Sequence, residues 1–124
     1  MSQVLAIAIG GAFGSVLRYG TSTWVYALVG RGFPYGTLVV NVLGSLAMGV
    51  LSVLLVERLG ASAVVRAGVL IGVLGGFTTF SSFSIETLNL IEQGALAKAA
   101  GNMAASLILC VGATWLGVIL ARQI

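Results

Sequence analysis

The sequence is constrained most by its long apolar runs, which contain almost no charge. The runs span residues 4–29, 37–56, 67–91 and 99–121, and short polar segments join them. A bilayer core about 30 Å thick needs roughly 20 apolar residues per helix, so each run is long enough to cross it once. We therefore expect an all-α integral membrane protein with four transmembrane helices.

The composition supports this fold class and excludes several functions. Only 7% of the 124 residues are charged, whereas soluble domains carry about 25%. No polar stretch could form a soluble catalytic domain, and histidine, the commonest general base, is absent. We therefore expect no enzymatic activity. The six Lys and Arg residues are scattered singly, which gives no support for a nucleic-acid partner.

The chain shows no repeat, linker or low-complexity tail, which predicts a single four-helix membrane domain over residues 1–124. No Lys or Arg precedes the first apolar run, so we expect this run to remain as a helix and not to be cleaved as a signal peptide. Glycines recur inside the runs, and small residues allow membrane helices to pack closely. The glycines in question are Gly10, Gly11, Gly14, Gly44, Gly49, Gly112 and Gly117.

The basic residues at the ends of the runs are almost balanced between the two sides of the membrane. Arg58, Arg66 and Arg122 fall on one side, and Arg31 and Lys98 fall on the other. An excess of one positive charge barely specifies an orientation. Two interpretations follow: the chain inserts both ways and pairs as an antiparallel dual-topology homodimer, or a weak bias selects one orientation.

The third run contains the segment GGFTTFSSFS, from Gly75 to Ser84, which has no aliphatic side chain. Paired glycines weaken a helix, and hydroxyls compete for its backbone hydrogen bonds, so we expect a break near residues 75–81. Carbonyls freed at membrane depth are typical ligands of a desolvated monovalent cation. The alternative is a continuous helix, in which the glycines allow a close crossing and the hydroxyls bond to the preceding turn.

Polar residues recur at helical spacing in three of the runs, which favours a lined pathway over helix packing alone. They are Asn41 and Ser45, then Thr79, Ser82, Glu86 and Asn89, then Asn102, Ser106, Cys110 and Thr114. An ionisable residue such as Glu86 in or near a membrane is a candidate functional residue. The other residues offer hydroxyl and amide donors, and Phe80 and Phe83 offer ring edges with partial positive charge. Such a set suits a small anion better than a cation.

Three segments carry a resemblance to a known family: GGAFGSVLRY near the start, GTLVVNVLGSLAMG from Gly36, and GGFTTFSSFSIE from Gly75. Together they resemble the CrcB, or Fluc, fluoride channel family. The resemblance implies a fluoride-specific channel that exports the ion passively and protects the cell from its accumulation. It also implies an antiparallel dual-topology homodimer with two pores, in the cytoplasmic (inner) membrane.

The resemblance further implies functional residues. A structural Na+, which is not transported, would bind the backbone carbonyls of Gly75 and Thr78. The implied fluoride pore comprises Asn41, Thr79, Phe80, Ser81, Ser82, Phe83, Ser84, Glu86, Ser106, Cys110 and Thr114. Two positions depart from the family pattern, since Asn102 replaces a frequent tyrosine and Cys110 a frequent serine. Arg18 fits an Arg-Tyr motif, and its role stays open between attracting anions and anchoring the first helix.

Two rival functions remain to be compared. A small multidrug-type proton-coupled exporter also has four helices, but it needs an acidic residue in the first helix. The first run contains Arg18 and neither Asp nor Glu. A non-transport membrane assembly protein would use the polar lines only to hold helices together, and it predicts liposomes that stay impermeable to fluoride.

Overall fold

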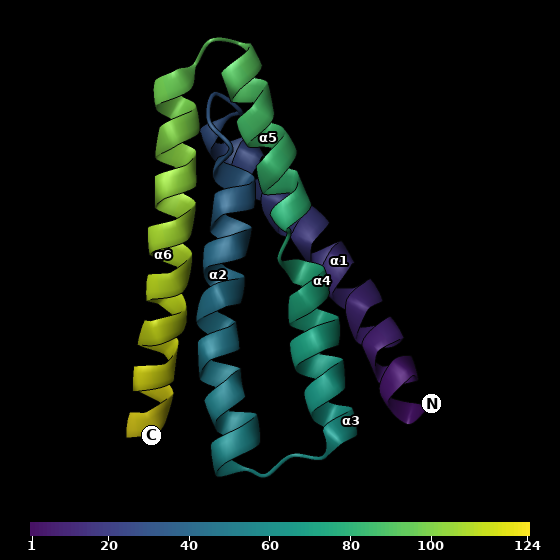
Figure 1. The fold of residues 1–124 in the computed structure, drawn as a ribbon. Helices are drawn as coiled ribbons and strands as arrows, with labels where there is room; N and C mark the ends of the chain where they lie inside the picture. Colours follow the sequence, from purple (N-terminus) through teal and green to yellow (C-terminus); the bar gives the residue numbers. More distant parts are fainter.

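The computed structural model describes residues 1–124 and is helical almost throughout (Figure 1). The first span is α1 (Ser2–Val29), and the second is α2 (Tyr35–Ser52), which continues as the π-helix η1 (Val53–Arg58). The third span consists of α3 (Ala63–Arg66), the π-helix η2 (Ala67–Leu74), α4 (Gly75–Phe77) and α5 (Phe80–Glu92). The fourth is α6 (Leu96–Gln123). Four helices are long and apolar enough to cross a membrane, as the sequence predicts.

Each helical span is longer than the apolar run that predicts it. The second span covers Tyr35–Arg58, the third Ala63–Glu92 and the fourth Leu96–Gln123. The apolar run marks only the part of a helix that crosses the hydrocarbon. The helix itself continues into the interface, where water can satisfy the polar groups at its ends.

The two ends of the molecule carry different connections (Figure 1). The N-terminus, the C-terminus and the connection from η1 to α3 lie at one end, and the α1–α2 and α5–α6 connections lie at the other. The first end holds an exposed ion pair of 3.1 Å between Arg122 and Glu57. The second end holds Arg31 and Lys98, so the basic residues divide between the ends as the spans predict.

Two close helix contacts organise the bundle, and both depend on glycine. A Cβ on Gly76 of α4 would lie 2.7 Å from the carbonyl oxygen of Gly11 in α1. A Cβ on Gly117 of α6 would lie 2.5 Å from the carbonyl oxygen of Leu46 in α2. Both distances are too short for a real side chain, so glycine is what allows these backbones to approach. Gly112 differs from the prediction, because nothing lies within 4 Å of its Cβ position.

The third span is broken at Thr78 and Thr79, which both have extended backbones. Thr78 has φ −79° and ψ 157°, and Thr79 has φ −151° and ψ 112°. The break is narrower than the segment 75–81 that the sequence predicts. Gly75 and Gly76 stay helical, and the Thr78 amide after them still donates to the Leu74 carbonyl (3.0 Å). The hydroxyl of Thr79 then accepts a hydrogen bond from the Ser82 amide and caps α5 (3.2 Å).

Candidate functional site

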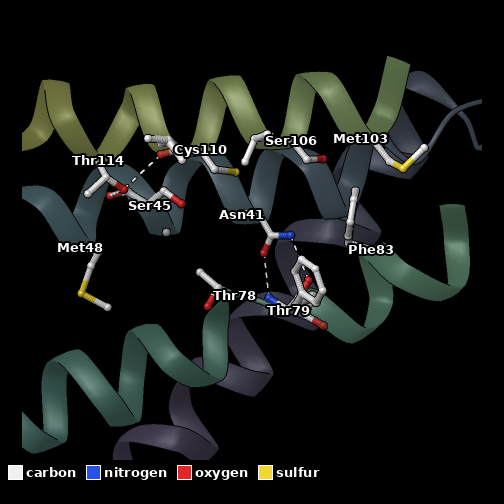
Figure 2. Close-up of a pocket in the computed structure, with 14 residues that line it drawn as sticks. Asn41, Ser45, Met48, Thr78, Thr79, Phe83, Met103, Ser106, Cys110 and Thr114 are labelled. Atoms are coloured by element: carbon white, nitrogen blue, oxygen red, sulfur yellow. Dashed lines mark hydrogen bonds between the residues drawn. The ribbon is translucent and has the colours of Figure 1, made fainter. Parts of the chain in front are cut away.

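The break opens onto a groove of about 580 Å³ between α2, the start of α5 and α6 (Figure 2). Its lining residues come from the three spans that carry polar lines. They are Asn41, Gly44, Ser45, Met48, Thr78, Thr79, Phe80, Phe83, Met103, Ser106, Leu107, Cys110, Val111 and Thr114. The structure thus brings seven of the eleven residues expected in a pore into one groove: Asn41, Thr79, Phe80, Phe83, Ser106, Cys110 and Thr114.

Asn41 reaches across the groove wall to the break. Its Nδ2 donates to the carbonyl oxygen of Thr79 (3.0 Å), and its Oδ1 accepts from the Thr79 amide (2.8 Å) (Figure 2). The side-chain amide therefore replaces the helical partners that an extended residue lacks. Because Nδ2 carries two hydrogens, one remains for another acceptor.

The two groove phenylalanines form a tilted pair, with ring centres 5.2 Å apart and planes at 43°. Phe80 is 77% exposed, although it follows the break directly in a span that crosses the membrane. Phe83 is half-buried and points into the groove (Figure 2). Ring edges carry partial positive charge and attract anions.

No charged side chain lines the groove. Its polar side-chain atoms belong to amide, hydroxyl and thiol groups. The Thr114 hydroxyl already has hydrogen-bond acceptors within the protein. This hydroxyl lies 3.0 Å from the Ser45 carbonyl and 3.1 Å from the Cys110 carbonyl, and its hydrogen can serve either. The groove therefore offers neutral dipoles to whatever occupies it.

Three hydroxyls of α5 that were expected in the pore do not line the groove. The Ser82 hydroxyl lies 3.1 Å from the hydroxyl of Thr79 and helps to cap α5. Ser81 is exposed, and its hydroxyl lies 3.4 Å from the same Thr79 oxygen. Ser84 is exposed and donates to the Phe80 carbonyl (2.9 Å).

Glu86 lies outside the groove too, in a second pocket of about 360 Å³ near the α1–α2 and α5–α6 connections. This outer pocket is lined by Tyr26, Arg31, Gly32, Phe33, Pro34, Glu86, Asn89, Leu90, Gln93 and Lys98. Glu86 accepts hydrogen bonds from the hydroxyls of Tyr26 (2.7 Å) and Thr37. The guanidinium of Arg31 lies 4.3 Å from the centre of the Tyr26 ring, and Lys98 donates to the Gly32 carbonyl (3.0 Å).

The polar line of α5 therefore has members in both pockets. Thr79 lines the groove, whereas Glu86 and Asn89 line the outer pocket. Sequence reasoning missed Tyr26 and Thr37 as partners of Glu86. No pattern could have found them, because they come from other helices, 60 and 49 residues away.

The polar line of α6 divides differently. Ser106, Cys110 and Thr114 line the groove, but Asn102 is only 2% exposed and lies outside it. Its Nδ2 donates to the hydroxyl of Thr87 (2.9 Å), which donates to the Phe83 carbonyl (2.7 Å). Asn102 thus holds α6 against α5 at the level of a groove phenylalanine.

The carbonyls expected to bind a cation, those of Gly75 and Thr78, have lost their helical donors. In an α-helix they would accept from the amides of Thr79 and Ser82, four residues later. Those amides donate to side chains instead. No hydrogen bond within the chain reaches the Thr78 carbonyl oxygen. Free carbonyl oxygens are suitable ligands for a small hard cation, so the residues present fit such an ion.

These features define a class: a four-span membrane protein whose broken helix opens onto an uncharged, donor-lined groove. The comparisons with known proteins are more specific. Residues 5–118 match the family described as CrcB-like protein, Camphor Resistance (CrcB), and the chain belongs to this family. The resemblance drawn from the three sequence segments is thereby confirmed.

Similar proteins carry the name fluoride-specific ion channel FluC. The protein of Coxiella burnetii (strain Dugway 5J108-111) is 52% identical over 123 residues, which cover 98% of this chain and 99% of the relative. That of Geobacter metallireducens is 47% identical over 124 residues, the whole of both chains. That of Methylococcus capsulatus is 50% identical over 122 residues, and the match covers 98% of this chain but only 54% of the relative. The names describe ion channels and not enzymes, in line with the absence of enzymatic activity expected from the sequence.

Proposed function

We propose that this chain is a fluoride-specific ion channel, which exports fluoride passively across the cytoplasmic membrane and lowers its concentration in the cytoplasm. Membership of the CrcB family and relatives named as fluoride channels support the proposal. The structural observation that carries it is the groove at the break, in which amide, hydroxyl and aromatic groups converge and no charged side chain is present.

The chemistry of the groove suits a small, strongly hydrated anion. A pore must replace the water around the ion with fixed donors and still release the ion. The free Asn41 hydrogen, the Ser106 hydroxyl, the weaker Cys110 thiol and the ring edges of the phenylalanines can do this. None of them is a full positive charge, which would hold the ion more tightly.

The outer pocket forms the mouth of this path. Arg31 and Lys98 raise the local concentration of anions there, and the polar line of α5 leads from the pocket to the groove. The carboxylate of Glu86 lies in the lining of this pocket, held by Tyr26 and Thr37.

The working unit is an antiparallel dual-topology homodimer. One chain leaves the groove open and Phe80 77% exposed, yet an ion path inside a bilayer must be covered by protein. A second copy, inserted in the opposite orientation, would supply this cover, and the near balance of basic residues at the two ends permits such insertion.

A structural Na+ would be held by the Gly75 and Thr78 carbonyls, whose helical donors have been diverted. Two copies would each contribute these oxygens to one ion. The ion would supply positive charge that fixes the backbone at the break, and it would not be transported.

Fluoride efflux from liposomes tests the function directly. Purified protein in liposomes should release fluoride rapidly, as recorded with a fluoride electrode, and should release little chloride. Liposomes that stay impermeable to fluoride would favour an assembly protein. Flux that requires a pH gradient would favour the proton-coupled exporter, although α1 contains no Asp or Glu.

Forced orientation tests the dimer. Two lysines added at one end of the chain should insert every copy the same way and abolish efflux. Co-expression with a variant that carries the lysines at the other end should restore it. Full efflux from one forced variant alone would contradict the antiparallel dimer.

A further inference from the structure

The break diverts two backbone amides from their helical acceptors, and one of them goes to Asn41. In a continuous helix the Thr79 amide would donate to the Gly75 carbonyl oxygen. In this structure it donates to Oδ1 of Asn41 at 2.8 Å. The Ser82 amide donates to the Thr79 hydroxyl in place of the Thr78 carbonyl. The acceptors left behind are thus the carbonyls of Gly75 and Thr78.

The same bond to Asn41 also fixes the direction of the Thr78 carbonyl. That carbonyl and the Thr79 amide belong to one planar peptide unit, which is trans, so the C=O and the N–H point in opposite directions. Because the N–H points to Asn41 in the groove wall, the Thr78 oxygen points away from Asn41. The second bond, from Nδ2 of Asn41 to the Thr79 carbonyl (3.0 Å), holds the next peptide unit as well.

We infer that Asn41 is a positioning residue for the cation site, and that its side chain couples this site to the anion groove. This inference rests on the proposed function and adds a physical link between its two ions. One amide orients the Thr78 carbonyl, frees the Gly75 carbonyl and presents its remaining hydrogen to the groove. Such coupling is reciprocal: a cation on the carbonyls stabilises the break, and the break holds the Asn41 donor in place.

Binding of Na+, measured without any fluoride flux, tests the inference. Thermal unfolding of the purified full-length protein is followed while Na+ replaces N-methylglucamine at constant ionic strength. The Tm of the unaltered protein should rise with Na+, because a bound ion stabilises the folded state. In Asn41→Leu, which has a similar volume but no acceptor, the apparent Kd for Na+ should rise by at least about tenfold, as it does when groups that orient metal ligands are lost.

Two further variants separate positioning from general damage. Asn41→Asp keeps an acceptor for the Thr79 amide, so it should retain the Na+-dependent rise in Tm while fluoride efflux falls. Ser106→Ala removes a groove hydroxyl that does not touch the break, and it should lower efflux with Na+ binding unchanged. If Asn41→Leu does not fold, Asn41→Ser replaces it, because its side chain is too short to reach the Thr79 amide.

An unchanged Kd for Na+ in Asn41→Leu or Asn41→Ser would overturn the inference. A Tm of the unaltered protein that does not change with Na+ would overturn it too. Efflux from liposomes of the same preparation shows which proposal has failed. Fluoride efflux without any effect of Na+ on Tm would leave the channel standing and remove the cation site. An Asn41-dependent effect of Na+ without fluoride efflux would support the positioning role of Asn41 and contradict both the channel and the coupling to it.

Discussion

The groove and the outer pocket lie on the same polar line of α5 but are built from different chemistry. The groove lining is uncharged, whereas the outer pocket contains Arg31, Lys98 and Glu86. Full charges are costly at membrane depth and cheap near the interface. The chain thus uses charge where water is available and neutral dipoles where the ion must be desolvated.

A charge placed in the groove should lower fluoride efflux more than any other substitution. In Ser106→Asp a carboxylate would face the passing anion across a medium of low dielectric constant. Like charges about 4 Å apart then repel by several kcal/mol, so fluoride efflux should fall by at least about 100-fold. Efflux from liposomes measures the loss. Ser106→Thr, which keeps a hydroxyl, is the control and should conduct; strong efflux from Ser106→Asp would contradict a neutral pore.

Loss of one ring edge should have a smaller effect. Phe83→Ile keeps an apolar side chain of similar bulk in the groove but removes the partial positive charge of the ring edge. Such an interaction is worth about 1 kcal/mol, so efflux should fall by about fivefold. Phe13→Ile provides the matched control, because Phe13 is exposed on α1 and lines neither pocket. Equal efflux from both variants would remove Phe83 from the pore.

Substitutions in the outer pocket should change efflux in a way that depends on salt concentration, unlike substitutions in the groove. In the double variant Arg31→Gln and Lys98→Gln, efflux should fall by about 2- to 5-fold at 0.01 M salt, because exposed charges contribute less than about 1 kcal/mol. The loss should vanish near 1 M salt, where charges are screened beyond about 3 Å. Arg66→Gln, at the opposite end of the chain, should change efflux at neither concentration. A loss that persists in high salt would mean that these residues act by contact.

Ser84 should give the smallest effect. It was expected in the pore, but it is exposed, lies outside both pockets and donates to the Phe80 carbonyl in its own helix. Ser84→Ala should therefore leave efflux within about twofold of the unaltered protein, as is usual for an exposed position. A loss as large as that of Phe83→Ile would extend the path onto this face of α5.

Sequence patterns predict those structural features that depend on neighbouring residues in the chain. The four spans follow from runs of apolar residues, and the break follows from glycines beside hydroxyls. Helical spacing also predicts that Ser106 and Cys110 share one face of α6, and both line the groove. Each of these features depends on residues that are close together in the chain.

The parts that sequence reasoning missed depend on contacts between distant segments. The break is only two residues wide, and Gly76 just before it packs on α1 in a contact that no local pattern contains. Asn102 continues the spacing of Ser106 and Cys110, yet its partner is Thr87, so it holds two helices together. Glu86 continues the line from Thr79, but Tyr26 and Thr37 hold it in a different pocket.

The only thiol of the chain belongs to Cys110, which lies half-buried in the groove and forms no disulfide. Thiosulfonate reagents attack the thiolate form of cysteine and reach it from water. The rate of modification therefore reports how well hydrated this part of the groove is, without any engineered label. If fluoride slows this modification, the ion occupies the groove in a protein whose sequence is unaltered.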